Sequence, residues 1–222
     1  MKNASVFWDK AAQKYAKSPI ADLKAYTYTL ERTRSYLSPT HHILEVGCGT
    51  GSTSLLLAEN VEQITASDYS KEMIEIGRQK SLNQGVSNVK FINADLFDNS
   101  LDGGPYDVVL AFNLLHLLPD TPAAIGRIHD LLKPGGLLIS KTFCPEGEKG
   151  SFKFHAIKMI LPLMQWVGKA PYVNFMKIAE LEEFITSNNF EIIETGNYPA
   201  VPPSRYIVAR KMLESAKNPQ ET

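Results

Sequence analysis

Ile43-Leu-Glu-Val-Gly-Cys-Gly-Thr-Gly51 is the segment from which the architecture of this chain can be inferred. Ile43 to Val46 is a short apolar run typical of a buried strand, and glycines follow it at three alternate positions. The amphipathic run Ser52 to Ala58 comes next without a break. A strand, a glycine-rich loop and a helix in this order are typical of a nucleotide-binding crevice in an α/β sheet.

The spacing of these glycines excludes two common phosphate-binding loops. The dinucleotide fingerprint requires Gly-x-Gly-x-x-Gly, whereas Gly51 lies only four positions after Gly47. The P-loop ends in Gly-Lys-Ser/Thr, and no Lys or Arg occurs from Ile43 to Ser70. An acid, Glu45, stands just before the loop instead, and this favours a ligand that carries positive charge.

The segment Glu45-Val-Gly-Cys-Gly-Thr-Gly51 resembles the first motif of the class I S-adenosylmethionine-dependent methyltransferases. S-adenosylmethionine carries a sulfonium and an ammonium group but no phosphate, which agrees with an acid beside the loop. The resemblance covers about residues 40–210. It implies a methyltransferase with S-adenosylmethionine as its cofactor. It also implies a Rossmann-like, three-layer α/β sandwich around a seven-stranded, mostly parallel sheet of order 3-2-1-4-5-7-6, with the last strand antiparallel.

The rest of the chain contains alternating strands and helices, as a parallel sheet requires. Helices are predicted within residues 4–37 (broken at Ser18-Pro19), at 71–82, from 121 and at 178–188, and further strands at 63–67, 89–93, 106–112 and 137–142. Ser70 and Thr121 are expected to cap the helices that follow them. Residues 190–195 and 205–210 are predicted to pair antiparallel, because the connection between them is too short for a helical crossover.

Candidate binding residues follow the predicted strands, where ligands bind in parallel sheets. Asp68 follows the second strand and is expected to accept hydrogen bonds from the ribose hydroxyls; its alternative role is to cap the next helix. Tyr69 is expected against the adenine ring, or else as a half-buried surface aromatic. After the third strand, Asp95 would accept from the adenine amino group and the Leu96 N–H would donate to a ring nitrogen. The alternative for Asp95 is a turn former.

The resemblance extends this site to the methionine part of the cofactor. Asn113 follows the fourth strand and would face this part, and Tyr15 would meet its carboxylate, with simple helix packing as an equal alternative for Tyr15. His116 is a candidate general base, or a group that orients the acceptor; the alternative is a packed histidine. The implied cofactor-binding residues are Tyr15, Glu45, Gly47, Gly49, Gly51, Asp68, Tyr69, Met73, Asp95, Leu96 and Asn113.

The segment 143–177 is longer than a simple linker and contains the apolar run from His155 to Val167. It is interpreted as a lid packed on the core, as a lid that shields a hydrophobic acceptor such as a lipid, quinone precursor or aromatic, or as a dimer interface. We favour a lid over a small hydrophobic or aromatic acceptor, methylated by direct in-line displacement. An aminopropyl transferase, a cyclase and a non-catalytic cofactor-binding regulator on the same fold stay open as alternatives.

Composition sets further bounds. The 222 residues predict one domain over 1–212, with a helical cap at 1–40, and a polar tail at 213–222. A net charge of −1 gives no electrostatic case for nucleic acid. No His-x-x-His or Cys-x-x-Cys spacing occurs, so no metal is expected. The chain lacks a signal-peptide pattern and any apolar run of about 18 residues, which favours a cytoplasmic monomer or homodimer without a transmembrane segment.

Overall fold

The computed structural model describes residues 2–145, 159–165 and 169–213. Part of the predicted lid (146–158 and 166–168) and the tail from 214 onward therefore lie outside the described residues. The elements in chain order are α1 (Lys2–Lys17), α2 (Leu23–Arg34), β1 (His42–Val46), α3 (Ser52–Leu57), η1 (Ala58–Asn60), β2 (Gln63–Asp68), α4 (Lys71–Gln84), β3 (Val89–Asn93), η2 (Asn99–Leu101), β4 (Tyr106–Phe112), η3 (Leu115–Leu117), α5 (Thr121–Leu131), β5 (Leu132–Phe143), α7 (Ile178–Ser187), β6 (Phe190–Ala200) and β7 (Pro203–Lys211). Residues 159–165 are also helical.

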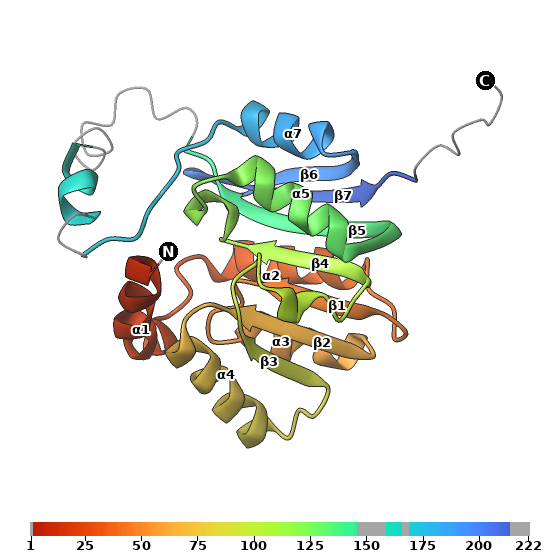
Figure 1. The fold of residues 1–222 in the computed structure, drawn as a ribbon, viewed down its shortest axis with the longest axis horizontal. Coiled ribbons are helices and arrows are strands. Elements are labelled where there is room, and N and C mark those ends of the chain that lie inside the picture. The colour runs from red at the N-terminus through yellow and green to blue at the C-terminus, as the bar shows by residue number, and fades with distance from the viewer. Residues whose placement is uncertain (1, 146–158, 166–168, 214–222) are drawn as a thin grey trace.

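One seven-stranded sheet of order β3-β2-β1-β4-β5-β7-β6 forms the centre of the molecule (Figure 1). β1 to β5 pair in parallel, whereas β7 is antiparallel to both of its neighbours, β5 and β6. The predicted fold is therefore confirmed. The predicted antiparallel pair is confirmed too, because β6 and β7 pair antiparallel and are joined by a short turn.

Helices cover both faces of this sheet and create two buried clusters. On β4, Val108 and Leu110 point into a cluster that α2, α3 and α4 complete, while Val109 and Ala111 point into a second cluster completed by α5 and α7. All four of these side chains are fully buried. Burial on both faces explains why the strand is a continuous apolar run instead of an alternating one.

Several predicted boundaries differ from the structure, and three of them concern the elements around the sheet centre. Helix α5 is capped by Asp120, whose Oδ1 accepts from the Ala123 N–H at 2.9 Å, so that Thr121 is its first residue and not its cap. β5 begins at Leu132 and not at 137, because Leu132 pairs with Tyr106 ahead of a register shift. The second predicted helix is shorter than expected and spans Leu23–Arg34.

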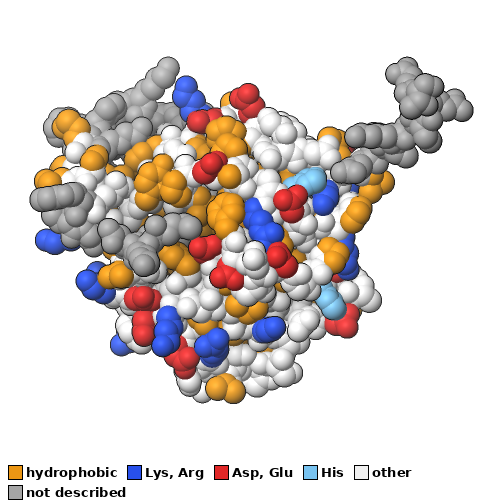
Figure 2. All heavy atoms as spheres, in the orientation of Figure 1, with side chains coloured by type: hydrophobic (Ala, Val, Ile, Leu, Met, Phe, Trp, Pro, Cys, Tyr) orange, Lys and Arg blue, Asp and Glu red, His pale blue; other side chains and the backbone are white. Residues whose placement is uncertain are grey.

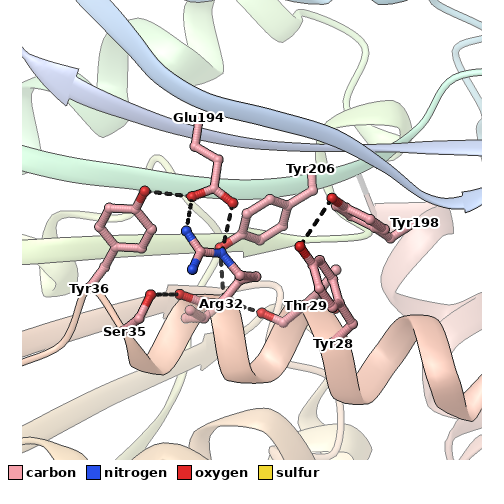
Figure 3. A network of polar contacts seen from close by, with 9 residues as sticks. Tyr28, Thr29, Arg32, Ser35, Tyr36, Glu194, Tyr198 and Tyr206 are labelled. Atoms are coloured by element: carbon pink, nitrogen blue, oxygen red, sulfur yellow. Dashed lines mark hydrogen bonds and ion pairs between the residues drawn. The ribbon is translucent and has the colours of Figure 1, made fainter.

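Polar contacts connect α2 to the distant strands β6 and β7 (Figure 3). Arg32 forms a two-pronged ion pair with Glu194, with Nε at 2.9 Å from Oε1, and the Tyr36 hydroxyl donates to the same carboxylate at 2.6 Å. The rings of Tyr28 and Tyr198 lie beside this pair, tilted by 45° to each other with centroids 4.4 Å apart. Residues far apart in the sequence are therefore joined across the face of the sheet.

The carboxyl ends of the parallel strands all lie at one end of the sheet. The arrowheads of β2 and β4 point toward this end in Figure 1, and α1 lies beside it. Hydrophobic side chains gather on the same side of the face drawn in Figure 2. Among the described residues, no helix has the length and apolar character needed to cross a bilayer.

Candidate functional site

The glycine loop lies at the carboxyl end of β1 and is hydrogen-bonded to β2. The Cys48 N–H donates to the Ser67 carbonyl at 2.9 Å, and the Gly51 N–H closes the turn onto the Cys48 carbonyl at 3.0 Å. Gly51 is the N-cap of α3. The predicted sequence of strand, loop and helix is thus confirmed.

The glycines at 49 and 51 have different surroundings, although both adopt left-handed backbone angles (φ of 54° and 71°). A Cβ on Gly51 would lie 2.4 Å from the Phe91 ring, so this glycine makes room for packing inside the protein. A Cβ on Gly49 would meet only Tyr15, at 3.7 Å. Gly49 therefore leaves open space beside the main chain, where a ligand can approach.

Three adjoining cavities meet at Gly47, which lines all of them. We name them lobes A, B and C, with volumes of about 250, 350 and 490 Å³. Lobe A is lined by Asp68, Tyr69, Asp95, Leu96, Leu118 and Tyr172, among others. Lobe B is lined by Tyr15, Tyr26, Glu45, Gly49, Thr53 and Asn113, among others. Lobe C is lined by Trp8, Tyr15, Met73, His116, Phe143 and Val173, among others.

The lobes bring together the residues predicted from the sequence, with one exception. Gly51 is not among the lining residues of any lobe, because it faces Phe91. Met73 lines lobe C and not lobe A. The binding roles assigned to these residues stay predictions.

Charge in the lobes is of one sign. Glu45, Asp68 and Asp95 line them, and no Lys or Arg stands among their described lining residues. Such a lining favours a ligand with positive charge over a phosphate-bearing one. The geometry therefore fits a sulfonium cofactor better than a dinucleotide.

Asp68 joins the glycine loop to the start of α4. Its Oδ2 accepts from the Gly49 N–H at 2.9 Å, and its Oδ1 accepts from the Ser70 N–H at 2.8 Å. Burial raises the pKa of this carboxyl, and the two backbone hydrogen bonds oppose that rise. Ser70 caps α4, as predicted, by accepting from the Met73 N–H at 3.2 Å. A carboxylate has further lone pairs, so Asp68 can still accept from a diol in lobe A.

Glu45 is buried at the base of lobe B, where it accepts a hydrogen bond from the Ser54 hydroxyl. Burial raises its pKa to about 7, against the opposing effect of the bond from Ser54, and the negative charge of Asp68 adds to the rise. The acid is therefore balanced between its neutral and charged forms near neutral pH. A cation placed in lobe B would favour the charged form.

Asp95 and Leu96 form the far wall of lobe A. Asp95 Oδ1 accepts from the Phe97 N–H at 2.8 Å, as in the turn-forming alternative, while the residue still lines the lobe. Arg127 from α5 supports this wall, because its Nε donates to the Leu96 carbonyl at 3.3 Å and its Nη2 pairs with Asp102 at 2.6 Å. Arg127 thus holds this wall of lobe A in place from the side that faces away from the cavity.

Asn113 and Tyr15 lie where lobes B and C adjoin. Asn113 has a left-handed backbone (φ 54°) and donates its N–H to the Lys141 carbonyl at 2.7 Å, which turns the chain sharply at the end of β4. Tyr15 reaches this point from α1 and packs edge-on against Trp8. Both residues therefore flank the opening between the two lobes.

His116 lines lobe C beside Phe143, with ring centroids 6.1 Å apart. Burial lowers its pKa to about 4, so the imidazole is neutral at neutral pH. Its Nδ1 is buried and has no hydrogen-bond partner among the described residues. The ring is therefore available to a ligand only through its other edge.

Sequence analysis did not identify several residues that line lobe C. Trp8 lies seven residues before Tyr15, on the same side of α1, and Phe143 is the last residue of β5. Helical spacing and the position at a strand end are the signals that could have identified these two. Val173 lies between elements and carries no such signal. No group of three or more His, Cys, Asp or Glu arranged to hold a metal occurs in the described ranges.

Comparisons with known proteins agree with this geometry. A family model described as a methyltransferase domain matches residues 43–136. A ubiquinone biosynthesis O-methyltransferase of Xanthomonas axonopodis is 30% identical over 165 residues, which cover 73% of this chain and 68% of that protein. A demethylmenaquinone methyltransferase of Staphylococcus epidermidis is 32% identical over 99 residues, 43% of this chain, and the match spans only 40% of that relative's length.

A solved structure shares the fold at lower sequence similarity. The magnesium protoporphyrin IX methyltransferase of Synechocystis, crystallised with bound S-adenosylhomocysteine, superposes with a TM-score of 0.69. It is 22% identical, and the match covers 94% of this chain and 95% of that one.

Proposed function

This chain belongs to the class I S-adenosylmethionine-dependent methyltransferases, and we propose that it methylates a small apolar or aromatic acceptor held in lobe C. The observation that carries this proposal is the lining of lobe C, to which Trp8, Met73 and Phe143 contribute together with one imidazole, His116. Apolar and aromatic walls with few polar groups are typical of sites for small hydrophobic ligands. The ubiquinone biosynthesis O-methyltransferase and the demethylmenaquinone methyltransferase among its relatives support the same class of acceptor.

The cofactor would occupy lobes A and B. In lobe A, Asp68 would accept from the ribose hydroxyls, and Asp95 with the Leu96 N–H would read the adenine ring beside Tyr69. In lobe B, Glu45 would stabilise the positively charged methionine part, next to Asn113. Gly47, which lines all three lobes, would lie beside the reacting centre. The open space beside Gly49 supports this arrangement.

The chemistry proposed is direct in-line displacement. The bound sulfonium supplies an electrophilic methyl group. The protein contributes alignment of the acceptor in lobe C and a site from which the apolar lining excludes water. No covalent intermediate with the protein is required.

His116 would touch the acceptor as a hydrogen-bond acceptor for its hydroxyl. With a pKa of about 4, the imidazole is a weak base. Moving a proton to it from a phenol of pKa about 10 is uphill by roughly 8 kcal/mol. The ring therefore orients the hydroxyl lone pair and receives the proton only as the new bond forms and the oxygen becomes acidic.

No observation favours the aminopropyl alternative. Such a transfer needs an acid-lined pocket for an amine. Among the described residues that line lobe C, the one carboxylate is Asp68, which already accepts from two backbone amides. The expectation of a monomer or homodimer stays a prediction that sedimentation would measure.

The proposal is tested first by calorimetric titration with S-adenosylmethionine, S-adenosylhomocysteine and NADH, and then by transfer of labelled methyl groups to matched acceptors. We expect binding of the first two ligands only, and faster methylation of a neutral alkylated catechol than of its carboxylated analogue. Phe143→Ala should raise the KM for the catechol without changing cofactor affinity, while Leu82→Ala, an exposed control on α4, should change neither. Preference for the carboxylated acceptor would refute the proposed acceptor class.

A further inference from the structure

Helix α1 packs against α4, and one carboxylate oxygen of α1 binds two donors at the start of α4. Asp9 Oδ1 accepts from the Ser70 hydroxyl at 2.6 Å and from the Glu72 N–H at 3.2 Å. Ser70 is itself the N-cap of α4. One oxygen of α1 therefore satisfies two donors at the start of another helix.

The position of this contact is electrostatically favourable. The first N–H groups of a helix lack partners within it, and the aligned peptide dipoles concentrate partial positive charge there. α4 has 14 residues, so its N-terminus carries this charge in full. Hydrogen bonds to a charged carboxylate are stronger than those between neutral groups.

Outside its packing against α4, α1 makes few contacts with the rest of the described structure. Ala12 is its fully buried side chain, and no described residue of α1 belongs to either of the two main buried clusters. Elements with few contacts to the core open at low free-energy cost. Yet α1 supplies Trp8 to lobe C and Tyr15 to lobes B and C, so an opening of α1 would uncover both lobes.

The same contact reaches the opposite wall of the site. Ser70 follows Asp68 and Tyr69, which line lobes A and C, and the Ser70 N–H donates to Asp68. Asp9 thus holds the covering helix and the start of α4 in one arrangement, without lining any lobe itself.

We propose that Asp9 is a positioning residue that latches α1 over the bound cofactor and thereby sets how fast the cofactor and its product leave. It acts through Trp8 and Tyr15 on one side and through Ser70 on the other. The inference depends on the cofactor and not on the identity of the acceptor, so it stands apart from the acceptor proposal.

The test measures release of S-adenosylhomocysteine by stopped-flow fluorescence. The chain has two tryptophans, Trp8 and Trp166, so a Trp166→Phe background leaves Trp8 on α1 as the reporter. In this background, Asp9→Ala should speed dissociation by about tenfold, the change expected for loss of a charge-assisted contact. The association rate should change little, and Trp8 emission in the complex should shift to the red as the helix opens.

Two matched variants separate the latch from a general loss of structure. Asp9→Asn keeps an acceptor oxygen but loses the charge, so it should restore the slow release only in part. Lys10→Ala, at an exposed neighbour on the same helix, should leave release unchanged. Alanine is a better helix former than aspartate, so Asp9→Ala does not weaken α1 itself. In steady-state assays the KM for the cofactor should rise without a fall in kcat.

An unchanged dissociation rate in Asp9→Ala would overturn the latch. So would equal acceleration in Lys10→Ala, which would show that any change in α1 has the same effect. Failure of the unsubstituted protein to bind S-adenosylhomocysteine would instead count against the cofactor site itself.

Discussion

Gly51→Ala is the substitution whose cost the structure defines best. The backbone at this position has a φ of 71°, and an added Cβ would lie 2.4 Å from Cε1 and 2.6 Å from Cζ of Phe91. Alanine in a left-handed conformation costs about 1–2 kcal/mol. Forcing an extra carbon against a packed ring costs a further 1–3 kcal/mol or so. The free energy of unfolding should therefore fall by roughly 2–5 kcal/mol.

The assay is urea denaturation followed by far-UV circular dichroism, with cofactor affinity measured by calorimetry in parallel. On heating, followed by the same signal, a loss of this size should lower the melting temperature by roughly 4–20 °C for a chain of this length. Because Gly51 lines none of the lobes, the folded variant should bind S-adenosylmethionine with nearly unchanged affinity.

Gly49→Ala is the matched control, two residues away in the same loop. Its added Cβ would meet only Tyr15 at 3.7 Å, so only the backbone cost of about 1–2 kcal/mol applies to stability. That methyl group would enter the space of lobes B and C, and affinity should fall clearly. If Gly51→Ala lost affinity while keeping its stability, the reasoning about Phe91 would be refuted.

Three further outcomes follow from the carboxylates and the imidazole of the site. Asp68→Asn leaves one of two buried N–H groups facing an amide NH₂, so stability should fall by about 1–3 kcal/mol and titration with S-adenosylmethionine should show weaker binding; unchanged affinity would remove Asp68 from the site. The pKa of Glu45 is raised to about 7 from 4.5, so the free energy of unfolding should fall as pH rises between these values. Binding of a cation should instead tighten as pH rises through 7 and should release protons, which calorimetry in buffers of different ionisation enthalpy would measure. Glu45→Gln should abolish both trends, and a pH dependence that persists in it would assign them to another group. His116→Asn should lower kcat by on the order of a hundredfold with unchanged cofactor affinity, and because the pKa of His116 is about 4, its contribution to the rate should be constant from pH 6 to 8; a rate that follows a group of pKa near 6.5 would contradict this environment.

The strands and the glycine loop could be predicted because their signals are local. Tyr106–Phe112 and Val89–Asn93 were predicted to the residue, since each is a short apolar or β-branched run bounded by turn formers. The start of β5 was not, because Pro134 and Gly135 indicate a turn, and only the tertiary pairing of Leu132 with Tyr106 extends the strand. Pairing between residues far apart in the sequence cannot be predicted from a short stretch of residues.

For the candidate site too, some features could be predicted from the sequence and others could not. Residues such as Asp68 and Asn113 were identified because they stand at strand ends. The different roles of Gly49 and Gly51 could not be inferred, because they depend on where the distant Phe91 ring lies. The predicted domain limits, cytoplasmic location and lid stay predictions, and part of the lid segment lies outside the described residues.

The position of β7 in the sheet determines when this protein can complete its fold during synthesis. β7 is the last of the described strands in the sequence, yet it lies between β5 and β6 and hydrogen-bonds to both. Until the ribosome has made β7, β5 has an unpaired edge and β6 has no partner in the sheet. Glu194 on β6 is then not held in position to pair with Arg32 of α2. Unpaired strand edges invite association between nascent chains. We therefore expect chains stopped before Pro203 to depend on chaperones, however complete their glycine loop.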